Sequence, residues 1–303
     1  MKKKVCIALY GQPRLLEDGH RNIMNSISSY SKDEFEIDFL CHTYDYENTN
    51  LKRYSDCSDW STTQHAKVEK NIEERIVSLY NPILYKIEEP FNDSKIDAYV
   101  DSVGLKDSLM WKNASREESK SISKRTLRRG NYTSTISQMN SRKQLVNLYK
   151  KLDKRYDFVV CMRYDFLRPL DSDLFYYIDP FYLNTSAELI NVLLQDNCLI
   201  SNPDIFLKCN SIIDNIPFLI NNQEFIDVCE DHPLIGEGFT PSMEQYLFCN
   251  LLYYYGNYDI IKKIEGIPTA RFHNTWLRDT HNYDPQTGWN LKEGKRTPSW
   301  FKE

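Results

Sequence analysis

Three runs of polar residues in this sequence each follow an apolar stretch with the length and composition of a strand. The runs are Gly11-Gln12-Pro13-Arg14, His42-Thr43-Tyr44-Asp45 and Arg163-Tyr164-Asp165. In open α/β sheets, ligands bind beyond the carboxyl ends of the strands, so charged and hydrogen-bonding groups placed there are candidates for chemistry. We therefore expect these three runs to supply the residues of a ligand site.

The sequence lacks the motifs that identify several common chemistries. It contains no G-x-G-x-x-G, no Walker sequence, no G-x-S-x-G, no H-E-x-x-H and no paired Cys/His spacing typical of zinc ligands. These absences argue against hydride transfer, P-loop chemistry and zinc-dependent hydrolysis.

The elements that would carry the polar runs alternate between strand and helix. Residues 5–10 form a continuous apolar run, which is typical of a strand buried on both faces of a parallel sheet. Apolar residues at helical spacing over 16–30 predict a helix, and alternation over 35–41 predicts a second strand. A helix over 64–80 and a strand over 83–87 continue this order. The pattern predicts an α/β fold.

The second half of the chain extends the same pattern. A helix over 134–154 leads into a central strand over 158–162. The pattern weakens over 91–133, which we interpret as an insertion or mobile loop, and the polar residues 274–303 are expected to pack over a surface. The sequence thus predicts one domain over 1–273 with a C-terminal extension. The other expected elements are strand and turn over 198–207, helices over 211–220 and 241–254, and strands over 259–264 and 269–272.

The composition is that of a globular chain without bulk positive charge. The 303 residues are 41% hydrophobic and 13% aromatic, which excludes a disordered or collagen-like chain. The net charge is −5, so any basic binding site must be local. No stretch reaches the ~20 apolar residues that span a bilayer, the N-terminal apolar run is too short for a signal peptide, and the eight cysteines include no C-x-x-C. We expect a cytoplasmic protein with reduced thiols and no membrane span.

The order of the motifs resembles a known family. A strand followed by Gly-Gln-x-Arg, a strand ending in His-Thr-Tyr-Asp, and Tyr156-Asp157-Phe158-Val159-Val160 running into Arg-x-Asp together resemble GT-A-type glycosyltransferases of bacterial surface glycans and of large viruses and phages. The similarity extends to Gln138-x-x-Ser141 and to Ser242-x-Glu244-Gln245. The resemblance implies an α/β, Rossmann-like GT-A fold with a mostly parallel central sheet flanked by helices, and a single catalytic domain over 1–273.

The same resemblance implies an enzyme that moves a sugar from a nucleoside-diphosphate sugar, with a UDP-sugar favoured, to a hydroxyl on a glycan or on a modified nucleobase. In such enzymes Mg²⁺ or Mn²⁺ bridges the diphosphate to an acidic residue, because hard divalent ions prefer carboxylate oxygen. Asp165 is the expected metal ligand and His273 a second one. The sequence offers Arg-x-Asp in place of Asp-x-Asp, which leaves metal dependence open. Asp171-Ser172-Asp173 is interpreted as a turn, because it follows Pro169.

Donor-binding roles are expected mainly at the strand ends. Gly11 would allow close approach of the backbone, while Gln12, Arg14 and Arg163 would address the nucleotide or its phosphates. The full set of expected donor-binding residues is Gly11, Gln12, Arg14, Thr43, Tyr44, Gln138, Ser141 and Arg163. Each residue also has an ordinary structural interpretation as a turn, strand-end or helix-surface residue.

An inverting transferase needs a carboxylate that takes the proton of the acceptor hydroxyl. Glu244 is the first candidate, Glu237 the second, and Asp231 remains possible. An acidic residue in the first turn of a helix is also favoured by the helix dipole, so Glu244 has a purely structural interpretation as well. The basic stretch 120–129 is either a solvated loop or part of an acceptor site that touches phosphate.

Three alternatives stay open from the sequence. The first is a non-catalytic protein that binds a sugar or nucleotide on the same fold. The second is a phage-type DNA glycosyltransferase acting on hydroxymethylated bases, which would have to extrude its target base from a duplex. The third is another nucleotide-using transferase on a Rossmann-like sheet, which would be distinguished by the nucleotide that it binds.

Overall fold

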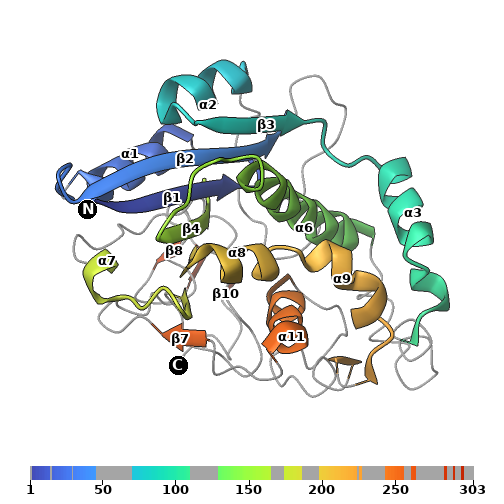
Figure 1. The fold of residues 1–303 in the computed structure, drawn as a ribbon. Coiled ribbons are helices and arrows are strands. Elements are labelled where there is room, and N and C mark those ends of the chain that lie inside the picture. The colour runs from blue at the N-terminus through green and yellow to red at the C-terminus, as the bar shows by residue number, and fades with distance from the viewer. Residues whose placement is uncertain are drawn as a thin grey trace.

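A computed structural model defines the fold of the chain (Figure 1). It describes residues 2–13, 16–28, 30–45, 70–109, 129–164, 174–185, 198–223, 225–226, 243–255 and 261–263, together with the pairs 283–284, 289–290 and 295–296. Within these residues, no helix combines the length and the apolar composition needed to cross a membrane.

A seven-stranded sheet with the order β3-β2-β1-β4-β6-β5-β7 forms the centre of the molecule. Its strands are β1 (Lys3–Tyr10), β2 (Phe35–Tyr44), β3 (Leu84–Glu88), β4 (Phe158–Arg163), β5 (Leu183–Thr185), β6 (Cys198–Ser201) and β7 (Ile261–Lys263). Neighbouring strands are parallel except where β6 pairs with β4 and with β5, both antiparallel. The sheet is therefore mostly parallel, as predicted from the sequence.

Helices cover both faces of the sheet, and the alternation of side chains along β1 shows how. Cys6, Ala8 and Tyr10 belong to one buried cluster with residues of α3, α6, α8, α9 and α11, whereas Val5, Ile7 and Leu9 belong to a second cluster with residues of α1, α2 and α7. The helices are α1 (Leu16–Ile27), α2 (Ile72–Tyr80), α3 (Asp93–Ser102), α6 (Arg129–Tyr149), α7 (Leu174–Tyr177), α8 (Pro203–Cys209), α9 (Ile212–Leu219) and α11 (Met243–Tyr255). The predicted Rossmann-like α/β fold, a mostly parallel sheet flanked by helices, is confirmed.

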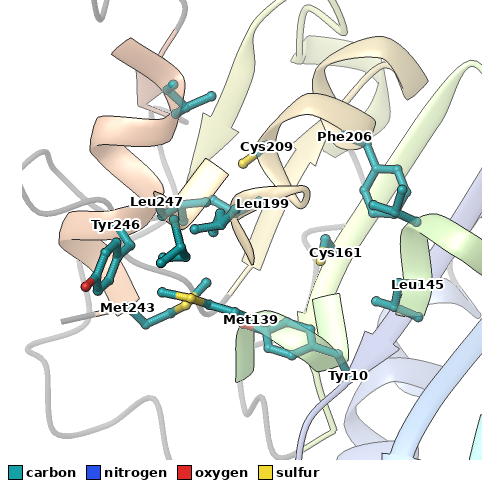
Figure 2. Close-up of a cluster of buried hydrophobic side chains, with 14 of the residues drawn as sticks. Tyr10, Met139, Leu145, Cys161, Leu199, Phe206, Cys209, Met243, Tyr246 and Leu247 are labelled. Atoms are coloured by element: carbon teal, nitrogen blue, oxygen red, sulfur yellow. The ribbon is translucent and has the colours of Figure 1, made fainter. Parts of the chain in front are cut away.

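The first of these clusters connects distant segments of the chain. Figure 2 shows Tyr10 from the end of β1 and Met139 from α6 in one group with Met243 from the first turn of α11. All three side chains are buried. This packing anchors the beginning of α11 against the end of the sheet where β1 terminates.

Residues 91–133, expected as an insertion or mobile loop, contain regular structure in their first part. Residues 93–102 form α3, and a short 3₁₀ helix, η2, spans Leu105–Asp107. Ile96, Val100 and Leu105 are buried in the same cluster as the sheet. The Asn92 side chain accepts a hydrogen bond from the Lys95 N–H at 2.9 Å and so caps the start of α3. Residues 110–128 lie outside the described part of the chain.

Other elements differ from the sequence-based expectations in their bounds. Helix α6 covers 129–149 rather than 134–154, and the segment expected as strand and turn over 198–207 is strand β6 followed by helix α8. Neither α7 nor β5 was expected. Within 274–303, three short strands form a separate antiparallel sheet, namely β8 (Tyr283–Asp284), β9 (Trp289–Asn290) and β10 (Lys295–Arg296). The expected strand over 269–272 lies outside the described residues.

Six cysteines in the described part are buried thiols that form no disulfide: Cys6, Cys41, Cys161, Cys198, Cys209 and Cys249. Burial raises the pKa of the Cys41 and Cys209 thiols to about 12, so both stay protonated at neutral pH. The coulombic effect of nearby Arg142 lowers the pKa of Cys209, but burial outweighs it. These cysteines act as small core residues.

Candidate functional site

The polar runs predicted from the sequence meet at the carboxyl edge of the parallel strands. Strand β1 pairs with β4 so that Tyr10 lies opposite Arg163, and β2 pairs with β3 so that Tyr44 lies opposite Glu88. A Cβ placed on Gly11 would lie 4.0 Å from the Arg163 Cγ. The turn after β1 and the end of β4 are therefore direct neighbours.

This position is a topological switch point of the sheet. The chain leaves β1 through α1 on one face towards β2, and it enters β4 from α6 on the other face. Ligands of open α/β sheets bind where the strand order reverses in this way. Among the polar runs, those at Gly11 and Arg163 flank that point.

Gly11 adopts a backbone conformation with φ of +101°. Its N–H donates to the Ser141 Oγ at 3.1 Å, and its carbonyl oxygen accepts from the Thr43 Oγ1 at 2.8 Å. The site has room for a Cβ, so the positive φ, rather than crowding, explains why glycine is needed. Side chains from β2 and α6 thus hold both polar groups of this residue.

His42 connects this turn to charged groups on β3. Its Nδ1 lies 2.6 Å from the Ser141 Oγ, and its Nε2 lies 2.9 Å from the Glu88 Oε1. Lys86 Nζ lies 2.9 Å from the other carboxylate oxygen of Glu88. Burial lowers the pKa of His42, and the bond to Glu88 opposes that change without reversing it. His42 is therefore neutral at pH 7.

The pKa of Glu88 determines which nitrogen of His42 carries the proton. Partial burial raises this pKa, but the hydrogen bonds from His42 and Lys86 outweigh that effect and lower the pKa to about 2. An ionised carboxylate only accepts hydrogen bonds, so the neutral ring must carry its proton on Nε2. Its Nδ1 then accepts the hydroxyl proton of Ser141, which leaves the Ser141 oxygen to accept from Gly11.

Ser141, His42 and Glu88 are the residue types of a hydrolytic triad, but their arrangement does not make a nucleophile. The Ser141 side chain has no exposed surface, and its oxygen already accepts the Gly11 N–H. A serine nucleophile must reach the substrate carbonyl. The three residues therefore form a buried hydrogen-bonded connection from β3 to the Gly11 turn.

Thr43 and Tyr44 were predicted to flank a nucleobase, and the structure gives both side chains other partners. The Tyr44 ring is 2% exposed; its hydroxyl donates to the Ser137 carbonyl at 2.7 Å and accepts from the Asn140 amide at 3.0 Å. The Thr43 hydroxyl bonds to Gly11. Tyr44 thus presents no ring face to a base in this arrangement; it is bonded to α6, and Thr43 is bonded to the turn.

Arg142 was missed in the sequence analysis. Its guanidinium is fully buried, lies 4.3 Å above the Tyr10 ring, donates to the Tyr10 hydroxyl, and donates to the Asn210 Oδ1 at 2.7 Å. A guanidinium keeps its proton, so a positive charge lies directly behind the end of β1. The available signal was spacing, because Arg142 stands midway between Met139 and Leu145, at intervals of three residues along a buried helix face.

The remaining predicted site residues divide into described and undescribed ones. Gln12 is half-buried, and Gln138 on α6 has a buried Oε1 for which no hydrogen-bond partner exists among the described residues. Glu244 lies in the first turn of α11, but its side chain is outside the described part. Arg14, Asp165, His273, Glu237 and Asp231 also lie outside the described residues, as do Asp171 and Asp173.

No metal centre can be assembled from the described residues. Among them, no group of three or more His, Cys, Asp or Glu side chains is placed to hold an ion. Glu88, one of the carboxylates at this edge, is bonded to His42 and Lys86. The metal role of Asp165 and His273 stays a prediction.

Comparisons with known proteins show no family for this chain. No family model matches the sequence, and neither does any curated protein. Among solved structures the chain is similar to the apo form of mouse xyloside xylosyltransferase 1, with 8% identity and a TM-score of 0.39, over 87% of this chain and 85% of that chain. A likeness this weak identifies neither a donor nor an acceptor.

Proposed function

We propose that this chain is a glycosyltransferase that moves a sugar from a nucleoside-diphosphate sugar to a hydroxyl acceptor. The observation that carries the proposal is the pairing of Gly11 and Arg163 at the topological switch point of the sheet. The positive φ of Gly11 turns the chain at the end of β1, and the side chain of Arg163, whose Cγ lies next to this turn, carries a guanidinium that matches the geometry of phosphate oxygens.

One further feature favours an anionic ligand at this edge, and another favours a ligand with hydrogen-bond donors. The buried guanidinium of Arg142 adds positive charge behind Tyr10, in a region of low dielectric where charges are weakly screened. The Oε1 of Gln138 is buried without a partner among the described residues, and in the proposal the side chain turns towards the nucleotide and accepts a hydrogen bond from one of its hydroxyl or base N–H groups. Gln12 and Arg14 follow Gly11 and would contact the same ligand.

In the proposed reaction the acceptor hydroxyl oxygen attacks the anomeric carbon, and the bond from that carbon to the diphosphate breaks. Arg163 offsets the charge that develops on the departing diphosphate. A carboxylate takes the hydroxyl proton; Glu244 is the first candidate, with Glu237 and Asp231 as alternatives. Packing of Met243 in the same cluster as Tyr10 supports Glu244, because it brings this turn of α11 to the Gly11 edge.

A divalent ion held by Asp165 and His273 would neutralise part of the diphosphate charge. The acceptor would be a glycan hydroxyl, or the hydroxyl of a modified base in DNA. A non-catalytic sugar- or nucleotide-binding protein remains the alternative, since Arg163 occupies the first position of the expected Asp-x-Asp.

A thermal-shift panel of UDP-, GDP-, CMP- and dTDP-sugars, each with and without Mn²⁺, tests the proposal. A ligand at ~100 times its Kd stabilises a protein by about 2.7 kcal/mol, which a melting curve resolves. We expect one nucleotide to raise the melting temperature and Arg163→Gln to abolish that rise. If no nucleotide has an effect on the wild-type protein, the proposal is wrong.

Transfer itself is tested with matched aspartate variants. We expect Asp165→Asn to abolish transfer, because the amide keeps the size of the side chain and loses its charge. Asp171→Asn is the control and should leave transfer unchanged. Equal activity in both variants would contradict the metal assignment, and nucleotide binding without any turnover would favour the non-catalytic alternative.

A further inference from the structure

We infer that His42 and Glu88 are positioning residues that act through Ser141 to hold the Gly11 turn in the conformation that receives the donor. This inference deepens the proposed function and rests on it. The two side chains come from β2 and β3, whereas the turn follows β1, so the effect crosses three strands of the sheet.

The hydrogen bonds between Glu88 and Gly11 form one directed chain. The Gly11 N–H donates to Ser141, the Ser141 hydroxyl to the His42 Nδ1, and the His42 Nε2–H to Glu88. Each donor in this chain meets one acceptor, and the chain ends on an ionised carboxylate. Successive hydrogen bonds polarise one another and are strengthened by a charged end, so the Gly11 amide is held more firmly than by Ser141 alone.

Burial makes the links at Ser141 and His42 necessary. His42 and Ser141 have no exposed surface, so water cannot replace a lost partner. A buried polar group that loses its hydrogen bond retains the cost of desolvation. An apolar contact between β2 and α6 would hold the helix without that risk. The hydrogen-bond chain instead begins at Gly11, the residue at the switch point, which fits a role in shaping the turn.

Thr43 completes the constraint on the turn from the other side of Gly11. Its hydroxyl fixes the direction of the Gly11 carbonyl. The peptide group is planar and trans, so the Gln12 N–H points the opposite way, away from Thr43. Together Ser141 and Thr43 fix the two peptide planes that meet at Gly11, with the φ of +101° between them. The donor then binds to a turn that is already formed, which lowers the entropic cost of binding.

The hold on Gly11 is measured first, without any nucleotide, through hydrogen exchange of the Gly11 amide in Ser141→Ala. Alanine favours the helix, so α6 should persist. We expect at least roughly tenfold faster exchange at Gly11, the factor that corresponds to one hydrogen bond. The matched control is Ser26→Ala, because Ser26 is also a buried helical serine but bonds to the Asn22 carbonyl of α1. It should leave Gly11 unchanged.

The role of His42 has its own spectroscopic signature. Its ¹⁵N resonances should report a neutral ring with the proton on Nε2. Glu88→Gln keeps an acceptor for that proton, so the Gly11 amide should still exchange slowly. Glu88→Ala removes the acceptor and should speed the exchange of the Gly11 amide several-fold. A His42 ring protonated on Nδ1, or a Gly11 amide indifferent to both Ser141→Ala and Glu88→Ala, overturns the inference.

Steady-state kinetics then connect the turn to the donor. We expect Ser141→Ala and Glu88→Ala to raise the donor KM by about 3- to 10-fold while kcat stays within about twofold, because a preformed binding turn contributes equally to ground-state and transition-state binding. An unchanged donor KM, despite a loosened Gly11, overturns the inference while the proposed function stands. A wild-type protein that binds no nucleotide sugar overturns both, and the exchange data separate the two failures.

Discussion

The two ends of the parallel strands use polar residues in opposite ways. At the amino end, Lys154 forms ion pairs with Glu36 and Asp38, and the Tyr156 hydroxyl donates to Asp38 at 2.8 Å. Lys154, Glu36 and Asp38 are 28%, 45% and 19% exposed in their side chains. At the carboxyl end, His42, Thr43, Ser141 and Arg142 have no exposed surface at all.

Lys3 gives the amino end a second surface anchor. Its Nζ donates to the Phe175 carbonyl at 3.0 Å and lies 5.3–6.0 Å from the ring centroids of Phe35, Phe158 and Tyr176. Contacts of this kind between a cation and aromatic faces contribute modestly where water has access. They fasten α7 to the sheet without burying an unpaired polar group.

The two ends differ in how far the fold depends on individual hydrogen bonds. Exposed ion pairs are replaceable by water and contribute ~0–1 kcal/mol. Buried hydrogen bonds are not replaceable, since a group left without a partner costs ~1–3 kcal/mol. The carboxyl edge therefore tolerates change poorly, and it is the edge at which ligands of such sheets bind.

A matched pair of substitutions, one at a buried side chain and one at an exposed ion pair, tests this difference most directly. Arg142→Met should lower the free energy of unfolding by about 3 kcal/mol, because the Tyr10 hydroxyl and Asn210 each lose a buried donor. Urea denaturation measures it. The neighbouring Lys143→Met, which loses an exposed pair with Asp214, should cost less than about 1 kcal/mol. Equal costs for the two variants would contradict the comparison.

A glycine pair separates strain from ligand binding. Gly11 and Gly104 both adopt a positive φ, +101° and +64°, and neither is crowded. Alanine at either position should lower the free energy of unfolding by about 1–3 kcal/mol through backbone strain. Thermal melts with and without nucleotide sugar should then show that Gly11→Ala loses the ligand-induced stabilisation and that Gly104→Ala keeps it. If Gly11→Ala keeps the ligand-induced stabilisation, Gly11 is not part of the site.

The pH dependence of stability sharpens the account of His42. Burial lowers the pKa of both His42 and His20 below their usual 6.5. Below pH 6.5 the unfolded chain binds protons that the folded chain does not bind. The free energy of unfolding therefore decreases as the pH is lowered, by at most about 1.4 kcal/mol per pH unit for each histidine. Above that pH both groups are neutral in both states and contribute no slope.

Urea titrations from pH 7.5 to 5 check this expectation. His42→Gln and His20→Gln should each flatten part of the slope, and their effects should add because the residues share no partner among the described bonds. Glu88 does not interfere, since its pKa of about 2 makes its contribution disappear only as pH falls below 4.5. A slope that persists unchanged in His42→Gln would mean that His42 is not held neutral by the fold.

The smallest effect is expected at the amino end. Lys154→Met removes two ion pairs but keeps most of the aliphatic stem against Tyr156, so it should change the free energy of unfolding by less than about 1 kcal/mol and leave nucleotide binding unaffected. Raising the salt concentration should reduce even this difference. A larger loss would show that the amino edge is as dependent on its polar contacts as the carboxyl edge.

Local pattern predicted the parallel half of the fold well and other segments poorly. The apolar runs of β1 and β4 and the alternation of β2 identified these strands, because strands buried on both faces contain little else. Helix α3 was not predicted, because Asp93, Asp97 and Asp101 interrupt the apolar pattern around the buried residues Ile96 and Val100. Strand β5 has three residues, too few to show a period.

The candidate site divides in the same way. The sequence identified the polar runs at the strand ends, and the structure brings the Gly11 and Arg163 runs side by side. Thr43, Tyr44 and Ser141 were predicted to contact the ligand. The structure buries all three, with Thr43 and Ser141 bonded to Gly11 and Tyr44 bonded to α6. Arg142 was overlooked because a charged residue is ordinarily assigned to the surface of a helix.

The amino-acid sequence by itself determined that this chain folds around a parallel sheet whose strands end in polar residues. Periodicity and turn chemistry are local properties, so they are readable without the fold. Only the tertiary structure decided that His42 and Glu88 reach Gly11 through Ser141, because these partners are separated by 46 to 130 residues in the chain. Burial converts that proximity into a constraint, since a polar group removed from water must find its partner within the protein.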